Sequence, residues 1–337
     1  MVSIIEAKTA WKTTVGAMKN HDFYHTYDYH HISKKEDEHP ILFSYTEGDV
    51  VIVIPFLKRA IPNTDYFDLT SVYGYAGPLS SNVDSSFDTS KFKKALDNWL
   101  NDEKIIAVFS RLHPYLEHQN HILSGMGSRP MLGKVVNIDI AQSLEEQRKQ
   151  YGKSTKNRTN KCRRLCEVKK AETDEEINTF IDIYYENMDR LSANKNYYFS
   201  REYFFNFLKC EDFETDILLV NHLEDNYTVA ASMFVKTGKI VQFHLSGSRT
   251  DYLSIAPANL FLDEMRLRGT AEGYTYFNLG GGLGGREDSL YNFKASFSKT
   301  YKEFSVWKYI ANQEIYDALS KDKANTDTDY FPLYRSN

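Results

Sequence analysis

A strand–helix–strand stretch in the second half of the chain decides the fold. It reads KIVQFHLS at residues 239–246, PANLFLDEMRLRGTAEG at 257–273 and YTYFNLGGG at 274–282. The first and last pieces are apolar and aromatic runs that predict strands. Pro257 opens the middle piece, which predicts a helix, because the missing N–H of proline is harmless at that position. A helix between neighbouring strands favours parallel pairing. We therefore predict that 239–246 and 274–279 are parallel neighbours.

The flanking segments extend this unit into a mixed sheet. Gly238 makes the tight turn that joins 239–246 to the strand before it, and that pair is antiparallel. The other predicted elements of this half are helices at 154–168, 174–190, 201–209 and 288–297, and strands at 216–223, 228–237 and 301–309. The order predicts an α/β (α+β) fold, a mixed and mostly antiparallel sheet flanked by helices.

The first half has a looser version of the same order. Residues 41–45 and 50–56 form a hairpin around the turn at Gly48, and an amphipathic helix is expected at 88–101. The length of 337 residues suits two such domains. We predict a first domain at 1–150 and a second at 151–310 with the basic helix at its start. Residues 311–337 are expected to pack back on the first domain.

The chain is acidic overall but carries one dense basic strip. It has 41 Lys and Arg against 46 Asp and Glu, a formal net charge of −5. Between Arg148 and Lys170, ten basic residues accompany a single acid, Glu167, so this strip carries +9 and the remainder −14. This distribution excludes a general nucleic-acid binder and gives no reason to expect a DNA partner. It favours a phosphate-bearing ligand, or one region of an RNA, held at one place. A solvated helix between domains is the structural alternative.

Several other classes are excluded by composition. No apolar run approaches the ~20 residues that cross a bilayer, and the start of the chain lacks the pattern of a secretion signal. Three cysteines do not make a disulfide scaffold and fit a reducing compartment, so we expect a cytoplasmic protein. Peripheral contact with a membrane stays open. His118 and His121 lack a third ligand with suitable spacing, so no metal is expected.

Short motifs occur in order along most of the chain. In the first half they are DFYHT at 22–26, YGYAGP at 73–78 and FSRLHP at 109–114. In the second half the motifs are the basic stretch at 154–168, HLSGS at 244–248, PAN at 257–259, YFNLGG at 276–281 and YNFKASF at 291–297. Together, over about residues 20–310, they resemble the FemAB-like acyltransferases of the GNAT superfamily.

The resemblance implies tandem GNAT-like domains and an enzyme that transfers an activated acyl group to an amine. Relatives include enzymes that move amino acids from aminoacyl-tRNA onto peptidoglycan precursors, and enzymes that use acyl-CoA in making surface glycans. The chain lacks the coiled-coil insertion of some tRNA users, and residues 249–256 stand where a loop usually cradles the pyrophosphate of CoA. We predict no tightly bound cofactor. The co-substrate is acyl-CoA, which we favour, or aminoacyl-tRNA.

The resemblance also places Lys294, with Phe293, beside the acyl donor as the catalytic pair. A fixed cation there stabilises the negative charge that develops on the carbonyl oxygen. The structural alternative is a surface lysine packed on neighbouring rings. The donor is expected where glycines end the strand at 274–279, because glycine permits close backbone approach; a flexible loop is the alternative. The predicted donor-binding residues are Ser246, Gly247, Asn259, Gly280, Gly281 and Gly282.

Acceptor-binding residues are expected in both halves. The phenols of Tyr73 and Tyr75 can bond a sugar or carbonyl oxygen, and Arg111 can grip a phosphate through two N–H groups. Rings that anchor a Gly-Pro turn, and an ion pair at a strand end, are the structural alternatives. Glu287 and Asp288 are candidates for a general base, although either can simply cap the next helix. The basic strip adds Lys156, Arg158, Lys161, Arg163 and Arg164 as phosphate contacts.

These features predict an acyltransferase that moves an acyl group to an amino group of a nucleotide-linked sugar, or of a cell-wall or surface-glycan precursor. That role belongs to peptidoglycan or polysaccharide biosynthesis. The enzymatic alternative is aminoacyl transfer from tRNA to a peptidoglycan precursor. An alternative of another class is a non-catalytic GNAT-like protein that binds a glycan precursor or a partner. The sequence does not identify the acceptor, the general base or the oligomeric state.

Overall fold

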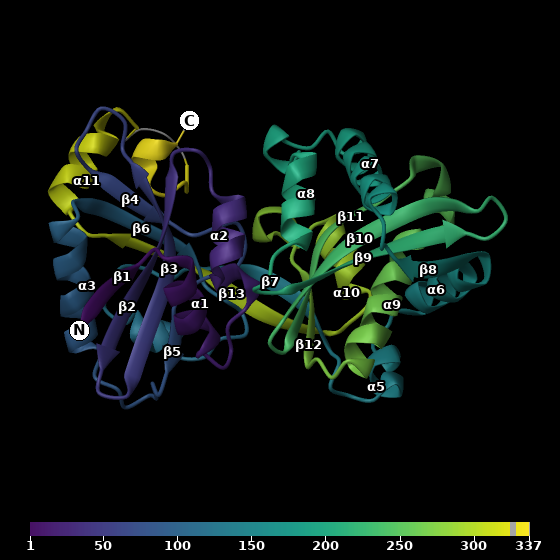
Figure 1. Cartoon of the computed structure of the whole chain (residues 1–337), viewed down its shortest axis with the longest axis horizontal. Helices are drawn as coiled ribbons and strands as arrows, with labels where there is room; N and C mark the ends of the chain where they lie inside the picture. The colour runs from purple at the N-terminus through teal and green to yellow at the C-terminus, as the bar shows by residue number, and fades with distance from the viewer. Residues whose placement is uncertain (324–327, 337) are drawn as a thin grey trace. The chain divides into compact units, whose positions relative to one another are not determined.

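The computed structural model of the protein describes residues 1–323 and 328–336 and divides into two units (Figure 1). The first unit holds residues 1–132 and the described residues from 303 onward, and the second holds residues 133–302. Residues 133–150 therefore group with the second unit instead of the first. Residues 303–310 group with the first unit, as do the described residues of the C-terminal segment. Strand pairing explains both departures from the predicted boundaries.

The second unit is built on a six-stranded sheet. Its neighbours pair antiparallel except β11 and β12, which are parallel as predicted from the helix between them. The mixed fold class predicted from the sequence is confirmed. In sheet order the strands are β8 (Cys166–Lys170), β9 (Glu214–His222), β10 (Tyr227–Thr237), β11 (Ile240–Ser248), β12 (Tyr276–Gly280) and β7 (Met131–Asp139).

Helices cover both faces of this sheet (Figure 1). On one face α9 packs against the sheet where Phe261 meets Phe234 of β10, with ring centroids 6.2 Å apart. On the other face α7 lies against Gly247 of β11. A Cβ atom on Gly247 would lie 2.4 Å from the carbonyl oxygen of Ile183, so only glycine permits this approach. The helices are α5 (Leu144–Lys149), α6 (Lys153–Leu165), α7 (Asp174–Arg190), α8 (Arg201–Leu208), α9 (Pro257–Ala271) and α10 (Ser289–Ala295).

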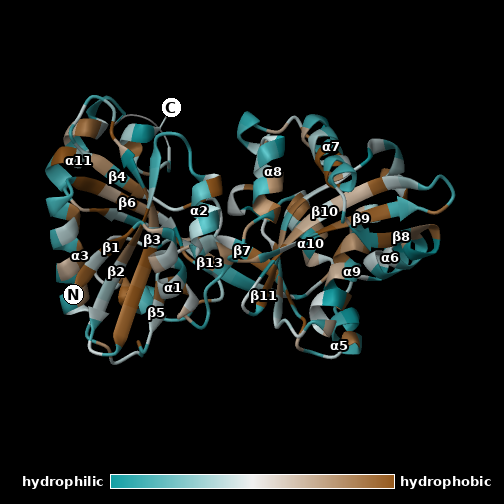
Figure 2. Ribbon diagram, viewed as in Figure 1, coloured by the Kyte–Doolittle hydropathy of each residue, from teal (hydrophilic) through white to brown (hydrophobic). Residues whose placement is uncertain are grey.

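The first unit repeats the six-strand pattern. It contains one parallel pair, β4 with β6, within an otherwise antiparallel sheet. Figure 2 shows hydrophobic residues concentrated on its strands, and its core includes the fully buried Trp307. The strands are β1 (Val2–Ile5), β2 (Glu38–Glu47), β3 (Val50–Ala60), β4 (Phe67–Thr70), β6 (Ile105–Arg111) and β13 (Thr300–Ile310), and β5 (Leu79–Ser81) pairs with β3. The helices are α1 (Lys8–Gly16), α2 (Tyr27–Ser33), α3 (Ser90–Asp102), α4 (Gln119–Ile122) and α11 (Gln313–Ser320).

Each unit takes its sixth strand from the other half of the chain. β7 follows β6 in sequence but pairs with β12 of the second unit, from Tyr276 opposite Asp139. β13 follows β12 in sequence, and its residues 306–310 pair with β6 of the first unit. A division drawn from the order of elements cannot detect this exchange, because both strands look like ordinary continuations of the preceding half.

The basic helix is shorter than predicted. α6 ends at Leu165, and Cys166 begins β8, where it pairs with His222 of β9. Cys162 on α6 and Cys166 at the start of β8 both have buried thiols. Residues 166–170 satisfy their backbone hydrogen bonds by pairing with β9 instead of continuing the helix. Among the described residues, no helix is both long and apolar enough to span a membrane.

Candidate functional site

The parallel pair of the second unit separates after three residue pairs. β11 and β12 are in register from Ile240 opposite Tyr276 to Gln242 opposite Asn278. β11 then continues along β10 to Ser248, with an irregularity in register after Phe243, whereas β12 ends at Gly280. Beyond Gln242 and Asn278 the two strands no longer pair, so the carboxyl ends of two adjacent parallel strands are freed. That is where ligands bind in open sheets of this kind.

A buried amide pair marks the point of separation. The side-chain Nδ2 of Asn278 donates to Oε1 of Gln242 across the two strands, at 2.8 Å. Its Oδ1 accepts the N–H of Gly280, also at 2.8 Å, and Asn278 is fully buried. The Asn278 side chain therefore joins the two strands at their last paired position and also bonds the backbone of Gly280, where the chain turns away. Unpaired buried amides would cost free energy, so this arrangement is strongly specified.

Lys294 lies beside the separated strands. It extends from α10, is only 8% exposed, and its Nζ donates to the carbonyl oxygen of Gly281 at 2.7 Å. The same nitrogen is 5.7 Å from the ring centroid of Phe243 on β11. Lys294 is thus a buried cation with contacts to β11 and to the residue after β12, and not a solvated surface lysine. Phe293, its predicted partner, is half-buried and meets Phe297 edge-on at 5.4 Å.

The surroundings of Lys294 favour partial loss of its proton. Burial lowers the pKa of its ammonium to about 8, and the nearby Asp288 carboxylate opposes this only in part. Asp288 itself caps α10, because it accepts the N–H groups of Tyr291 and Leu283, and these bonds lower its pKa. Glu287 is exposed and forms an ion pair with Lys134 at 2.9 Å. The lowered pKa of Asp288 is the opposite of what a general base at neutral pH needs.

The glycines after β12 are required by close contacts. Gly280 has φ +75°, and a Cβ there would lie 3.1 Å from the Lys294 Nζ. A Cβ on Gly281 would lie 2.6 Å from the carbonyl oxygen of Lys134 on β7. Gly282 precedes a short 3₁₀ turn, and like the other two it is half-buried. These positions keep the backbone tight around the lysine, which a flexible loop would not do.

The other predicted donor residues lie on β11 and at the start of α9. Ser246 is half-buried and pairs with Ser232, whereas the surroundings of Gly247 are occupied by α7. Asn259 is buried in the first turn of α9, and its N–H donates to the Ala256 carbonyl at 3.0 Å. Whether these three residues contact a donor stays a prediction.

The segment that replaces the expected pyrophosphate loop is engaged within the protein. Residues 250–255 form a 3₁₀ helix before α9. The Arg249 guanidinium and the Thr250 N–H both bond the Glu186 carboxylate, each at 2.8 Å. The Tyr252 hydroxyl donates to Asp225 at 2.7 Å. Arg249, Thr250 and Tyr252 of this segment are therefore bonded to neighbouring side chains.

In the first unit, Tyr73 and Arg111 come together. Tyr73 is 61% exposed, and the Arg111 guanidinium lies 5.8 Å from the centroid of its ring. No acid of the described chain lies within ion-pair distance of Arg111, unlike the strand-end ion pair considered from the sequence. Tyr75 packs edge-on against Phe304 at 5.0 Å, and burial raises the pKa of its phenol above the usual range. Tyr73 and Arg111 thus present polar groups, whereas Tyr75 serves packing.

The residues of the basic strip separate into two groups. Lys156 and Arg163, seven positions apart on α6, line a pocket with α5 and α9. Arg158, Lys161 and Arg164 are exposed elsewhere on the helix, and the described residues offer them no acidic partner. The predicted set is therefore not one surface.

Sequence reasoning missed two parts of this unit. Asn278 and Gln242 were counted only as members of strands, although a buried amide at the end of a predicted parallel pair is a recognisable signal. Asp263 and Arg266 on α9 were also missed. They are three positions apart on the helix, a spacing that places opposite charges within reach of each other on one face.

Residues 215–306 match the family described as the FemAB family. This segment runs from β9 into β13 and includes the separated strands, the glycines and Lys294. The resemblance predicted from the sequence is thereby confirmed for this part of the chain, and it supports transferase activity. Comparison with curated protein sequences gave no match.

Solved structures share the fold over nearly the whole chain. The crystal structure of FemX has a TM-score of 0.71 at 13% identity, covering 94% of this chain and 99% of that one. A conserved protein of unknown function from Bacteroides thetaiotaomicron VPI-5482 has a TM-score of 0.59 at 13% identity, covering 92% and 100%. The C-terminal domain of a putative lysylphosphatidylglycerol synthetase from Agrobacterium fabrum has a TM-score of 0.55 at 11% identity, covering 92% and 94%.

The amide pair gives a direct stability prediction. Asn278→Leu keeps the size of the side chain but removes its hydrogen bonds to the Gln242 side chain and to the Gly280 N–H. We expect the free energy of unfolding to fall by about 3 kcal/mol, since each buried group loses a bond. Urea denaturation measures it. Asn206→Leu, at an exposed position on α8, is the matched control and should change stability by less than ~0.5 kcal/mol. Equal losses in the two variants would contradict a special role for Asn278.

Proposed function

We propose, from the premise of a FemAB-type segment on a GNAT-like fold, that this protein is an acyltransferase whose reacting acyl group binds beside Lys294. The observation that carries the proposal is the buried ammonium with contacts to Gly281 and Phe243, next to the end of a parallel strand pair. Acyl transfer develops negative charge on the carbonyl oxygen, and a fixed cation in a poorly hydrated site stabilises that charge strongly.

The proposed reaction is attack of an acceptor amine on the acyl carbonyl carbon. A C–N bond forms and the C–S bond of a thioester, or the C–O bond of an ester, breaks. The amine proton passes to the departing thiolate or alkoxide, directly or through water. Such a donor is already activated, so positioning the amine can suffice without a dedicated base. This is consistent with the commitment of Asp288 to the helix cap and of Glu287 to Lys134.

The acceptor we propose is an amino group of a nucleotide-linked sugar, or of a cell-wall or surface-glycan precursor. The donor we favour is acyl-CoA. Aminoacyl-tRNA is the second candidate, and two observations favour it: the FemAB match, and the commitment of Arg249 and Tyr252 to internal partners where a pyrophosphate loop would otherwise lie. Exposed Tyr73, with Arg111 against its ring, supports an acceptor contact in the first unit.

Incubation with candidate donors tests this function. Purified protein is mixed with a pool of cell-extract metabolites and either acetyl-CoA or charged tRNA, and the products are analysed by mass spectrometry. We expect a new species whose added mass equals the acyl group of one donor and whose parent carries a free amine. A product formed only with charged tRNA would replace acyl-CoA as the donor. No acyl product with either donor would favour the non-catalytic binding protein.

Removing the charge of Lys294 tests its catalytic role. Lys294→Met keeps the length of the side chain and its apolar stem. We expect kcat and kcat/KM to fall together by roughly 10²–10³-fold, because the interaction is strongest in the transition state. Steady-state kinetics with the identified substrates measures both constants. Lys299→Met, the same change at an exposed lysine five residues later, should retain normal rates. Near-normal kcat in Lys294→Met would rule out the electrophilic role.

The pH dependence tests which protonation state of Lys294 is active. The ammonium, with its pKa lowered to about 8 by burial, is charged below that pH and loses its charge above it. If the charged form acts, kcat/KM of the wild-type enzyme falls as the pH rises through about 8. In Lys294→Arg the guanidinium stays protonated, so the residual activity should lack this fall. A wild-type rate that rises steadily to pH 10 would instead identify the neutral amine as the working form.

A further inference from the structure

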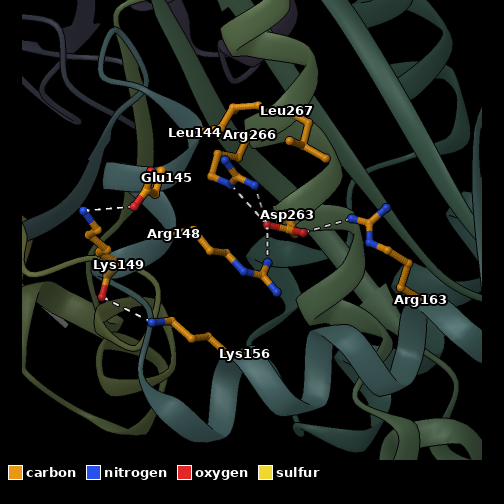
Figure 3. Close-up of a pocket in the computed structure, with 9 residues that line it drawn as sticks. All are labelled: Leu144, Glu145, Arg148, Lys149, Lys156, Arg163, Asp263, Arg266 and Leu267. Carbon is orange, nitrogen blue, oxygen red and sulfur yellow. Dashed lines mark hydrogen bonds and ion pairs between the residues drawn. The ribbon is translucent and has the colours of Figure 1, made fainter.

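A pocket lined mainly by charged side chains lies between three helices of the second unit, α5, α6 and α9 (Figure 3). Five basic and two acidic side chains line it, so its formal charge is positive although the whole chain is negative. Two leucines supply the apolar part of its wall. The lining residues are Leu144, Glu145, Arg148, Lys149, Lys156, Arg163, Asp263, Arg266 and Leu267.

Asp263 organises this pocket. Its carboxylate is buried and bonds three guanidinium groups, those of Arg148, Arg163 and Arg266, each at 2.9 Å (Figure 3). The Tyr151 hydroxyl donates to the same carboxylate at 2.9 Å. Burial alone would raise the pKa of Asp263, but Arg266 and Arg148 outweigh it and lower that pKa, so the carboxylate stays ionised. The single carboxylate of Asp263 thus orients three guanidinium groups.

The three arginines are not equally occupied. Arg266 is buried and divides its donors among Asp263, Gln147 and Tyr151, so it forms the floor. Arg148 and Arg163 are 27% and 42% exposed in their side chains, and each uses only part of its five N–H donors on Asp263 and one neighbour. Their guanidinium planes are fixed by the shared carboxylate while other N–H groups remain available to a ligand.

Lys156 adds a cation that the protein does not neutralise. Its Nζ lies 3.5 Å from the carbonyl oxygen of Lys149, and no acidic side chain of the described residues pairs with it. Lys149, by contrast, bonds Glu145 and Glu146. Among the described residues, the pocket therefore combines two pre-oriented guanidinium groups with one ammonium that has no acidic partner. Oxygen atoms of phosphate match this set, because guanidinium groups bind them through two parallel N–H bonds and lysine as a point charge.

The form of the pocket favours a compact anion over an extended strand. Its three arginines come from three helices and converge on one carboxylate instead of following a line. Single-stranded nucleic acid is bound by basic grooves that also offer aromatic faces for base stacking. Here the exposed wall is aliphatic, and the buried ring of Tyr151 lies between Arg148 and Arg266, with guanidinium carbons 5.0 and 5.7 Å from its centroid.

The pocket is joined to the element that carries Lys294. Near the start of α6, the Thr155 hydroxyl donates to the Ser296 hydroxyl at 2.8 Å, and the Gly152 N–H donates to the Ser296 carbonyl at 2.8 Å. Ser296 is the C-cap residue of α10, two positions after Lys294. A ligand anchored by Lys156 would thus be held by a helix that is bonded directly to the end of the helix bearing Lys294.

We propose that this pocket binds a compact phosphate anion, best a diphosphate group, with Arg148, Lys156 and Arg163 as its phosphate contacts. The assignment goes beyond the acyl-transfer proposal and can be tested without turnover. It keeps two of the five basic residues that the sequence suggested, adds Arg148 from α5, and leaves out Arg158, Lys161 and Arg164.

Calorimetric titration of the full chain with inorganic pyrophosphate, and separately with uridine diphosphate, tests the site at low ionic strength. We expect both to bind the wild-type protein. Lys156→Met should weaken each by roughly tenfold, the value of one charge-assisted hydrogen bond. Lys161→Met, the same change on another side of the same helix, should alter affinity by less than about twofold because it acts only through the screened surface field. Thermal melting confirms that both variants are folded.

The remaining outcomes overturn the proposal in distinguishable ways. Absence of binding to either anion would mean that the arginines serve only to hold Asp263 and the helices together. Equal losses in Lys156→Met and Lys161→Met would indicate a diffuse basic surface. A short single-stranded RNA that binds through Lys156, when pyrophosphate and uridine diphosphate do not, would assign the pocket to RNA. None of these results depends on acyl transfer, so failure of the pocket and failure of the enzymatic proposal are separate.

Discussion

The hydrogen bond between the Asn278 and Gln242 side chains is the interaction on which the second unit depends. It joins β12 to β11 at their last paired position, and the same Asn278 side chain then captures the Gly280 N–H. The chain beyond this point turns away, so the strands part and Lys294 occupies the space beside Gly281. A buried polar contact of this kind adds little net stability when satisfied, but it excludes registers in which its members would be left unpaired.

The burial of Lys294 has an energetic cost. Lowering the pKa of an ammonium from about 10.5 to about 8 corresponds to roughly 3 kcal/mol against the charged form. The Gly281 carbonyl and the Phe243 ring recover part of this cost. An apolar side chain of similar length would fill the same space without any desolvation. Retaining a cation there is consistent with a site where negative charge develops for a moment and must be met by a group already in place.

A buried carboxylate, and not the density of basic residues along the chain, decides which basic side chains of the second unit are held in fixed positions. The +9 strip looks uniform along the chain, yet Asp263, about a hundred residues later, selects Arg148 and Arg163 from it and fixes their orientation. The low-dielectric environment of α9 makes that carboxylate a strong attractor. The remaining exposed cations of α6 are screened by solvent and contribute a general positive field. Helix α6 therefore contributes one oriented arginine to the pocket and also carries exposed basic side chains that lie outside it.

The sequence alone determined the periodic elements, the parallel pair around residues 239–279 and the candidate status of Lys294, because these depend on local pattern and short motifs. Local pattern cannot report which strand completes which sheet, and only the tertiary structure revealed that β7 and β13 are exchanged between the halves. Local pattern also could not predict the contact of Asp263 with Arg148 and Arg163, since that contact requires α5, α6 and α9 to pack together. Ion pairs between different helices arise from packing, so the local pattern of the chain does not specify them.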